Sequence, residues 1–152
     1  MTNLLDRYTE IERLMVQHGP EKFSLHVWGA DAGDPDAELG DMVDGSWLPN
    51  LSDCGAKACF FGYAAIAANN LDDPVTVAND MPGQAVARWL DVDMSVANSG
   101  NMNERQAERH SDLYWAERPD YDAMAQIEYD AVLAYVRSRI SALTLSLVPE
   151  MA

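Results

Sequence analysis

DCGAKACFFGYAAIAA, the sequence from Asp53 to Ala68, contains both cysteines of the chain. The longest run of uncharged residues in the chain begins within it. No charged residue occurs from Ala58 to Leu71, although 23% of the chain is charged. A segment that is apolar on every side and rich in alanine has to be covered by other elements, so it predicts a buried helix. Ser52 or Asp53 can cap this central helix, which we expect to end near Ala68.

Four further segments carry the signals of helices. They combine capping residues with apolar residues spaced three or four positions apart, as amphipathic helices do. Asn103 and Gln106 have the spacing of a capping box, in which each residue bonds to the backbone of the other. We expect these helices over residues 3–17, 80–90, 104–115 and 120–143.

Two short segments predict strands. Phe23, Leu25 and Val27 alternate with polar residues, and Val75–Val77 is a second short run, so the two segments can pair as a β ribbon. Trp28 follows the first segment and is expected to be a core anchor. A chain of 152 residues fits one domain, residues 1–152. We therefore expect a mainly α-helical fold, a compact bundle of about five helices around the central helix, with a short two-stranded ribbon.

The charge of the chain is strongly acidic. Twenty-five acidic and ten basic residues give a formal net charge of -15. This charge argues against direct binding to nucleic acid, which depends on Lys and Arg, and against binding to anionic membranes. The longest uncharged run is also shorter than a membrane-spanning helix. The charge either keeps the protein soluble or forms a surface for a basic partner protein.

The acids are concentrated around the central helix. Between Phe23 and Ala87 there are ten acids and one base, Lys57. Many lie in a predicted loop over residues 29–52, which lacks the ligand spacing of an EF-hand, so no metal site is predicted. The expected partner-binding acidic surface consists of Asp31, Asp34, Asp36, Glu38, Asp41, Asp44, Asp72, Asp73 and Asp80.

Cys54 and Cys59 allow several kinds of chemistry. A structural zinc site needs four donors, and the three histidines are not paired in spacing. No export signal is visible, so we expect a cytoplasmic protein in which a disulfide is disfavoured. Burial of the two thiols as small apolar side chains is the simplest account. A thiol enzyme or redox protein that uses Cys54 or Cys59 stays open as an alternative, as does a structural or oligomeric scaffold.

The central segment also carries a motif. Cys54-Gly55-Ala56-x-x-Cys59-x-x-Gly62-x-Ala64 resembles the pattern C-G-T-x-x-C-x-x-G-x-A of small bacterial and phage proteins. The resemblance extends in order from Phe23 to Ile140, with Ala56 in place of Thr and Asp91 in place of Gly. It implies a compact, mostly helical module that is often phage-associated, and it implies no activity. The structural motif residues are Trp28, Cys54, Gly55, Cys59, Gly62 and Trp89.

The motifs of nucleotide-binding proteins, serine hydrolases and metalloproteases are missing from the sequence. We therefore predict no catalytic residue, no metal and no cofactor. The sequence favours a non-enzymatic acidic interaction protein with a basic protein partner. With the phage resemblance, the most concrete form is an inhibitor of a nucleic-acid-binding host or defence protein that acts by occluding or mimicking DNA.

Overall fold

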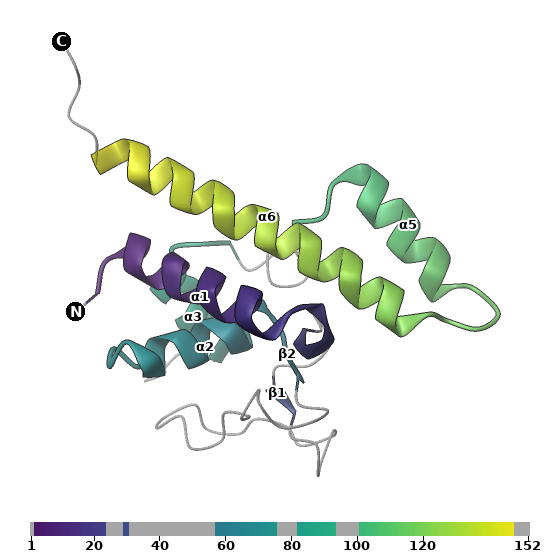
Figure 1. Cartoon of the computed structure of the whole chain (residues 1–152), viewed down its shortest axis with the longest axis horizontal. Coiled ribbons are helices and arrows are strands. Elements are labelled where there is room, and N and C mark those ends of the chain that lie inside the picture. Colours follow the sequence, from purple (N-terminus) through teal and green to yellow (C-terminus); the bar gives the residue numbers. More distant parts are fainter. Residues whose placement is uncertain (1, 24–28, 31–56, 76–81, 94–100, 148–152) are drawn as a thin grey trace.

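The computed structural model describes residues 2–23, 29–30, 57–75, 82–93 and 101–147, and this part of the chain is mainly α-helical, as expected (Figure 1). A 3-10 turn, η1 (Pro20–Lys22), and two short strands, β1 (Gly29–Ala30) and β2 (Lys57–Ala58), accompany the helices. The five α-helices described are α1 (Leu4–His18), α2 (Phe60–Asn70), α3 (Pro82–Leu90), α5 (Glu104–Tyr114) and α6 (Tyr121–Leu147).

The ends of the outer helices follow their capping residues. The Asn3 side chain accepts a hydrogen bond from the Asp6 amide at 2.8 Å, and α1 ends at Gly19, whose φ of 72° lies in the left-handed region that favours glycine. Asn103 and Gln106 form the predicted capping box at the start of α5. The Asp120 carboxylate accepts from the Ala123 amide at 3.0 Å. The expected helices are thus confirmed, and α6 continues beyond its predicted end.

The start of the central helix differs from the prediction. We expected a cap at Ser52 or Asp53, but α2 begins at Phe60 and its N-cap is Cys59. The Cys59 thiol accepts a hydrogen bond from the Gly62 amide at 3.4 Å. The residues just before it are extended, because Lys57 and Ala58 pair with β1 in the antiparallel strand pair. The uncharged run therefore contains a strand end followed by a shorter helix.

Helix α2 is buried, as its composition predicted. Eight of its eleven residues are buried, and seven of these belong to one apolar cluster with residues of α1, α3 and α6. Two tyrosine hydroxyls bind backbone carbonyls across this core: Tyr129 donates to Met15 at 2.8 Å and Tyr63 donates to Lys22 at 3.1 Å. These bonds satisfy phenol groups whose burial would otherwise be unfavourable.

The predicted ribbon of residues 23–27 and 75–77 lies largely outside the described residues, as does Trp28. The strand pair that the structure shows joins other segments, with Gly29 opposite Ala58 and Ala30 opposite Lys57. Val75 is buried in the core and lies outside any strand.

Helix α6 crosses the molecule and carries packing on two sides (Figure 1). It packs against α1 in the main core, while α5 lies along its N-terminal half as the other arm of a helical hairpin. None of the described helices combines the length and the apolar character needed to cross a lipid bilayer.

Candidate functional site

Most of the expected acidic surface falls on residues that the structure does not describe. Asp31, Asp34, Asp36, Glu38, Asp41, Asp44 and Asp80 lie outside the described ranges, and so do the motif residues Cys54 and Gly55. Asp72 and Asp73 are described. Asp72 is exposed at the end of α2 with a φ of 55°.

Asp73 is engaged inside the fold. Its carboxylate accepts hydrogen bonds from the Thr2 hydroxyl at 2.6 Å and from the Arg7 guanidinium at 3.1 Å. The Thr2 hydrogen bond, followed by the nearby charge of Arg7, holds the pKa of Asp73 below its ordinary value. This carboxylate therefore fastens the N-terminus and α1 to the segment after α2.

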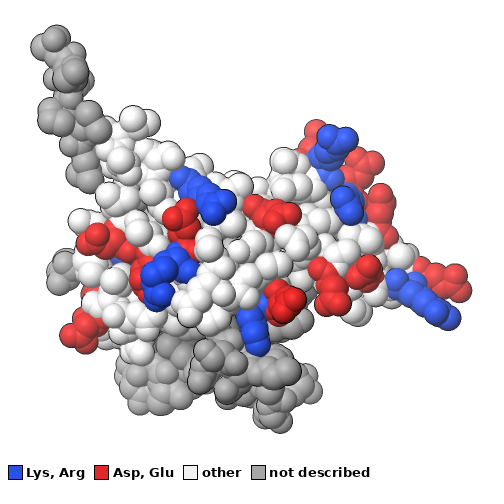
Figure 2. Space-filling model, in the orientation of Figure 1, with Lys and Arg blue, Asp and Glu red and all other residues white. Residues whose placement is uncertain are grey.

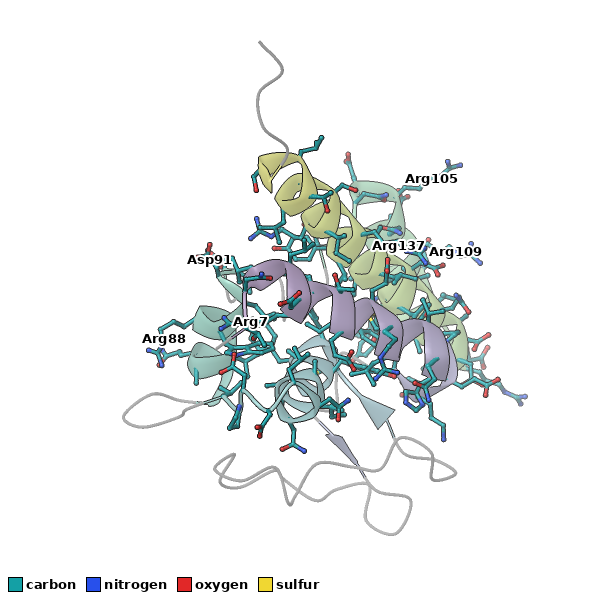
Figure 3. All side chains as sticks on the ribbon, turned by 60° about the vertical axis from the view of Figure 1, so that its left-hand side comes forward. Arg7, Arg88, Asp91, Arg105, Arg109 and Arg137 are labelled. Atoms are coloured by element: carbon teal, nitrogen blue, oxygen red, sulfur yellow. The ribbon has the colours of Figure 1, made fainter. Side chains whose placement is uncertain are left out.

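Trp89, a motif residue, completes this cluster. The Arg7 guanidinium lies 4.7 Å from the centre of the Trp89 ring and donates to the Trp89 carbonyl at 2.7 Å. Figure 3 shows Arg7 between α1 and α3. The neighbouring Tyr8 hydroxyl donates to the Leu90 carbonyl at 2.9 Å. Together these contacts satisfy carbonyls at the end of α3, which have no partner within the helix.

Cys59 is the motif cysteine that the structure describes. Its surroundings favour a role in packing over a role in thiol chemistry. Its side chain is buried in the core and caps α2 through Gly62, which is also buried. Burial raises the pKa of the Cys59 thiol to about 11, so it stays protonated and weakly nucleophilic near neutral pH. Within the described part of the chain, no group of three His, Cys, Asp or Glu residues is placed to hold a metal ion.

A different surface stands out on α5. This helix has no buried residue, and its half-buried side chains, Gln106, His110 and Leu113, share the face toward α6. On the opposite face the spacing of 3.6 residues per turn aligns three carboxylates with an indole. We call this face the outer face of α5; it consists of Glu104, Glu108, Asp112 and Trp115, all exposed.

Aromatic side chains gather where α5 turns into α6. Trp115 is 79% exposed and packs edge-on against Tyr114, with ring centres 5.0 Å apart. Tyr121, at the start of α6, is 64% exposed. It lines an open pocket of about 470 Å³ formed by residues Arg118–Asp122. Large exposed aromatic side chains in a group are typical of interaction sites.

Charge accompanies these aromatics. The segment 104–122 carries six carboxylates and three arginines, and Figure 2 shows both kinds of charge over α5 and its loop. Arg105 and Arg109 project from α5 toward solvent (Figure 3). Among the described residues, the ion pairs leave Glu104, Glu108 and Asp112 without a basic partner. The outer face of α5 therefore presents unpaired acids beside an exposed indole.

The opposite side of α5 is fixed to α6 through a buried acid. His110 Nε2 lies 2.6 Å from Glu128 Oε2, and Glu128 is 1% exposed. A carboxylate in an apolar environment requires such a partner. The contact sets which face of α5 points outward.

The capping box predicted α5, but the outer face of this helix was not among the expected sites. The signal was present, because Glu104, Glu108 and Asp112 recur at intervals of four and Trp115 follows on the same stripe. That spacing stood out less than the higher density of acids between Phe23 and Ala87.

Comparison with models of protein families, with curated protein sequences and with solved structures finds no match for this chain.

Proposed function

We propose that this protein is a non-enzymatic acidic interaction protein that binds a basic protein partner through the outer face of α5. The proposal rests on the exposure of Trp115. Its side chain is 79% exposed and lies at the end of a row of three unpaired carboxylates. Trp115 is the C-cap of α5, a helix that buries none of its residues and so adds little to the core.

The aromatic part of the surface supports a protein partner. Trp and Tyr are enriched among the residues that contribute most to protein–protein binding, because they bury a large area with few rotatable bonds. Trp115 has Tyr114 beside it and Tyr121 across the loop. A partner pocket that takes the Trp115 indole would remove it from water.

The charge of the surface supports a basic partner. Carboxylates four residues apart on a helix are separated by a rise of about 6 Å, so Glu104, Glu108 and Asp112 form a regular acidic row. The whole-chain charge of -15 adds a long-range attraction that speeds encounter with basic proteins at low salt. Arg105 and Arg109 border the row and would disfavour a partner that lacks acids of its own at its edge.

We further propose, as the more specific form, that the partner is a nucleic-acid-binding protein and that this chain occupies its DNA-binding surface. The support is the same excess of carboxylates, since a surface that attracts phosphates also attracts carboxylates. If this form is correct, double-stranded DNA competes with the protein for the partner. Simultaneous binding of both would restrict the proposal to the general form.

The capture of partners from a bacterial lysate tests the general form. Immobilised wild-type protein is compared with Trp115→Ala at low and at high salt, and the captured proteins are identified and sorted by isoelectric point. We expect the wild type to retain a basic protein at low salt, with less at high salt and less on Trp115→Ala. Leu145→Ala is the matched control, because Leu145 is an exposed apolar residue of α6 away from this surface.

Capture that is unaffected by salt, or by Trp115→Ala, would count against the proposal. So would capture that Leu145→Ala reduces equally, since the effect would then reflect general stickiness of exposed apolar residues.

A further inference from the structure

Helix α5 is held to the rest of the molecule by few side chains. Its capping box at Asn103 and Gln106, and the bond from the Trp115 amide to the Ser111 carbonyl at 3.0 Å, are made within its own segment. The helix contributes one apolar side chain, Leu113, to its half-buried inner face. On the α5 side, one partly exposed leucine is a small apolar contribution to this contact.

A polar contact between α5 and α6 holds the helix more strongly than the packing of Leu113 does. Glu128 is the one charged residue that is buried among the described residues, and its carboxyl meets the His110 ring at 2.6 Å. Nε2 donates to the Glu128 carboxylate when it carries the ring proton, and it accepts when the Glu128 carboxyl is protonated. While α5 stays attached, loss of the His110 side chain would leave the Glu128 carboxylate buried without this hydrogen bond, which favours release of α5.

Glu128 belongs to a side of α6 that is distinct from the main core. Met124 and Ala131, four residues before and three residues after it, lie on the same face and are buried, yet neither belongs to the core cluster that joins α1, α2 and α3. Release of α5 would therefore leave the main core intact. The hairpin has its own attachment, and Glu128 lies at its centre.

We propose that α5 is a detachable arm and that the His110–Glu128 contact is the latch that holds it on α6. The latch keeps the outer face of α5 turned away from α6, so the arm presents its carboxylates and Trp115 in one fixed arrangement. Binding is strongest in the latched state, because the surface is then preorganised. This role in binding rests on the function proposed above, whereas the latch itself does not.

Hydrogen exchange of the full chain, followed by mass spectrometry, tests the latch. In His110→Leu the hydrogen bond between His110 and Glu128 is lost, and we expect the amides of α5 to exchange about tenfold faster or more. The amides of α1 and α2 should be unchanged. His110→Gln can still donate to the carboxylate and should keep slow exchange in α5. Ser111→Ala, on the exposed side of the helix, is the matched control.

The double variant His110→Leu with Glu128→Leu tests whether the loss of protection in α5 comes from a buried carboxylate without the His110 hydrogen bond or from altered packing. Two apolar side chains can pack where the polar pair was, so protection of α5 should return toward the wild-type level. Three outcomes would overturn the latch: slow exchange of α5 in His110→Leu, faster exchange of α1 and α2 as well, or no recovery in the double variant.

Binding of a synthetic lysine-rich peptide, measured on the same proteins, separates the two proposals. We expect His110→Leu to bind the peptide several-fold more weakly than the wild type and the double variant to recover. If exchange follows the predicted pattern while peptide binding does not change, the latch stands and the outer face of α5 is not the binding surface.

Discussion

Cys59 acts at the boundary between the strand pair and the buried helix, where its thiol is both a core side chain and a cap. Cys59→Ala removes the acceptor for the Gly62 amide, so we expect the free energy of unfolding to fall by about 1–2 kcal/mol. Cys59→Ser keeps an acceptor and should be less destabilised. Denaturant unfolding in the presence of a reductant measures both. Equal destabilisation of the two variants would show that Cys59 stabilises the protein through packing and not through the cap.

The reactivity of this thiol is a separate test. Burial raises the pKa of Cys59 to about 11, so little thiolate exists at pH 8. In a Cys54→Ala background, which leaves one thiol, iodoacetamide should label the native protein far more slowly than the unfolded protein. Labelling at comparable rates would contradict the buried position and would revive a role in thiol chemistry.

Asp91 occupies a backbone position that favours glycine. Asp91 follows the last residue of α3 and has a φ of 54°. The Val92 amide closes the turn by donating a hydrogen bond to the Ala87 carbonyl at 2.9 Å. Asp91→Gly removes both the strained conformation and an acid at the negative end of the helix dipole, so we expect stability to rise by about 1 kcal/mol. Thermal unfolding measures it. Asp91→Ala is the control, because it removes the charge and keeps the strain; an equal gain there would assign the effect to charge alone.

At the scale of elements, the outer face of α5 should be dispensable for folding. We expect the triple variant Glu104→Gln, Glu108→Gln, Asp112→Asn to unfold at the wild-type temperature or slightly above it, because like charges four residues apart on a helix repel each other by about 0.2–0.5 kcal/mol per pair. Circular dichroism with heating measures this. A clear loss of stability would mean that these acids serve the fold and would weaken the proposed function.

The helices were predictable because their signals are local. Asn3, Gly19 and the pair of Asn103 and Gln106 mark helix ends within a few residues of the backbone groups they satisfy. The start of α2 was not, because an uncharged run looks the same in a buried strand as in a buried helix, and the pairing of Lys57 and Ala58 with β1 is not local.

The candidate surface was harder to predict for a similar reason. The sequence shows where acids are dense, but it does not show which acids are already engaged. Asp73 is bonded to Thr2 and Arg7, which lie 71 and 66 positions away. Conversely, Trp115 could be taken for a core residue until the packing of α5 showed it exposed.

For the whole molecule, the hydrogen-bonded carboxylates of Asp73 and Glu10 make the free energy of unfolding depend on pH in the acidic range. Hydrogen bonds from Thr2 to Asp73 and from Arg13 to Glu10 are the largest causes that hold the pKa of each carboxyl below its ordinary value. Each contributes stability above its unfolded pKa, near 4, and loses it as the pH falls through the lower folded pKa.

We therefore expect Asp73→Asn to be less stable than the wild type at pH 7 and to lose less stability between about pH 4 and pH 2. Urea unfolding across this range measures both slopes. Parallel curves for the two proteins would show that Asp73 titrates alike in the folded and unfolded states.

A comparison of affinities shows whether the basic partner binds the outer face of α5. The Kd of the captured basic protein is measured at low salt for the triple variant Glu104→Gln, Glu108→Gln, Asp112→Asn. It is also measured for a control with the same change in net charge on exposed acids elsewhere, Asp6→Asn, Glu21→Gln, Asp130→Asn. We expect the first variant to weaken binding about tenfold or more and the control to weaken it about threefold or less. An equal effect of the two variants would contradict binding through the outer face of α5, because net charge and not this helix face would then determine the affinity.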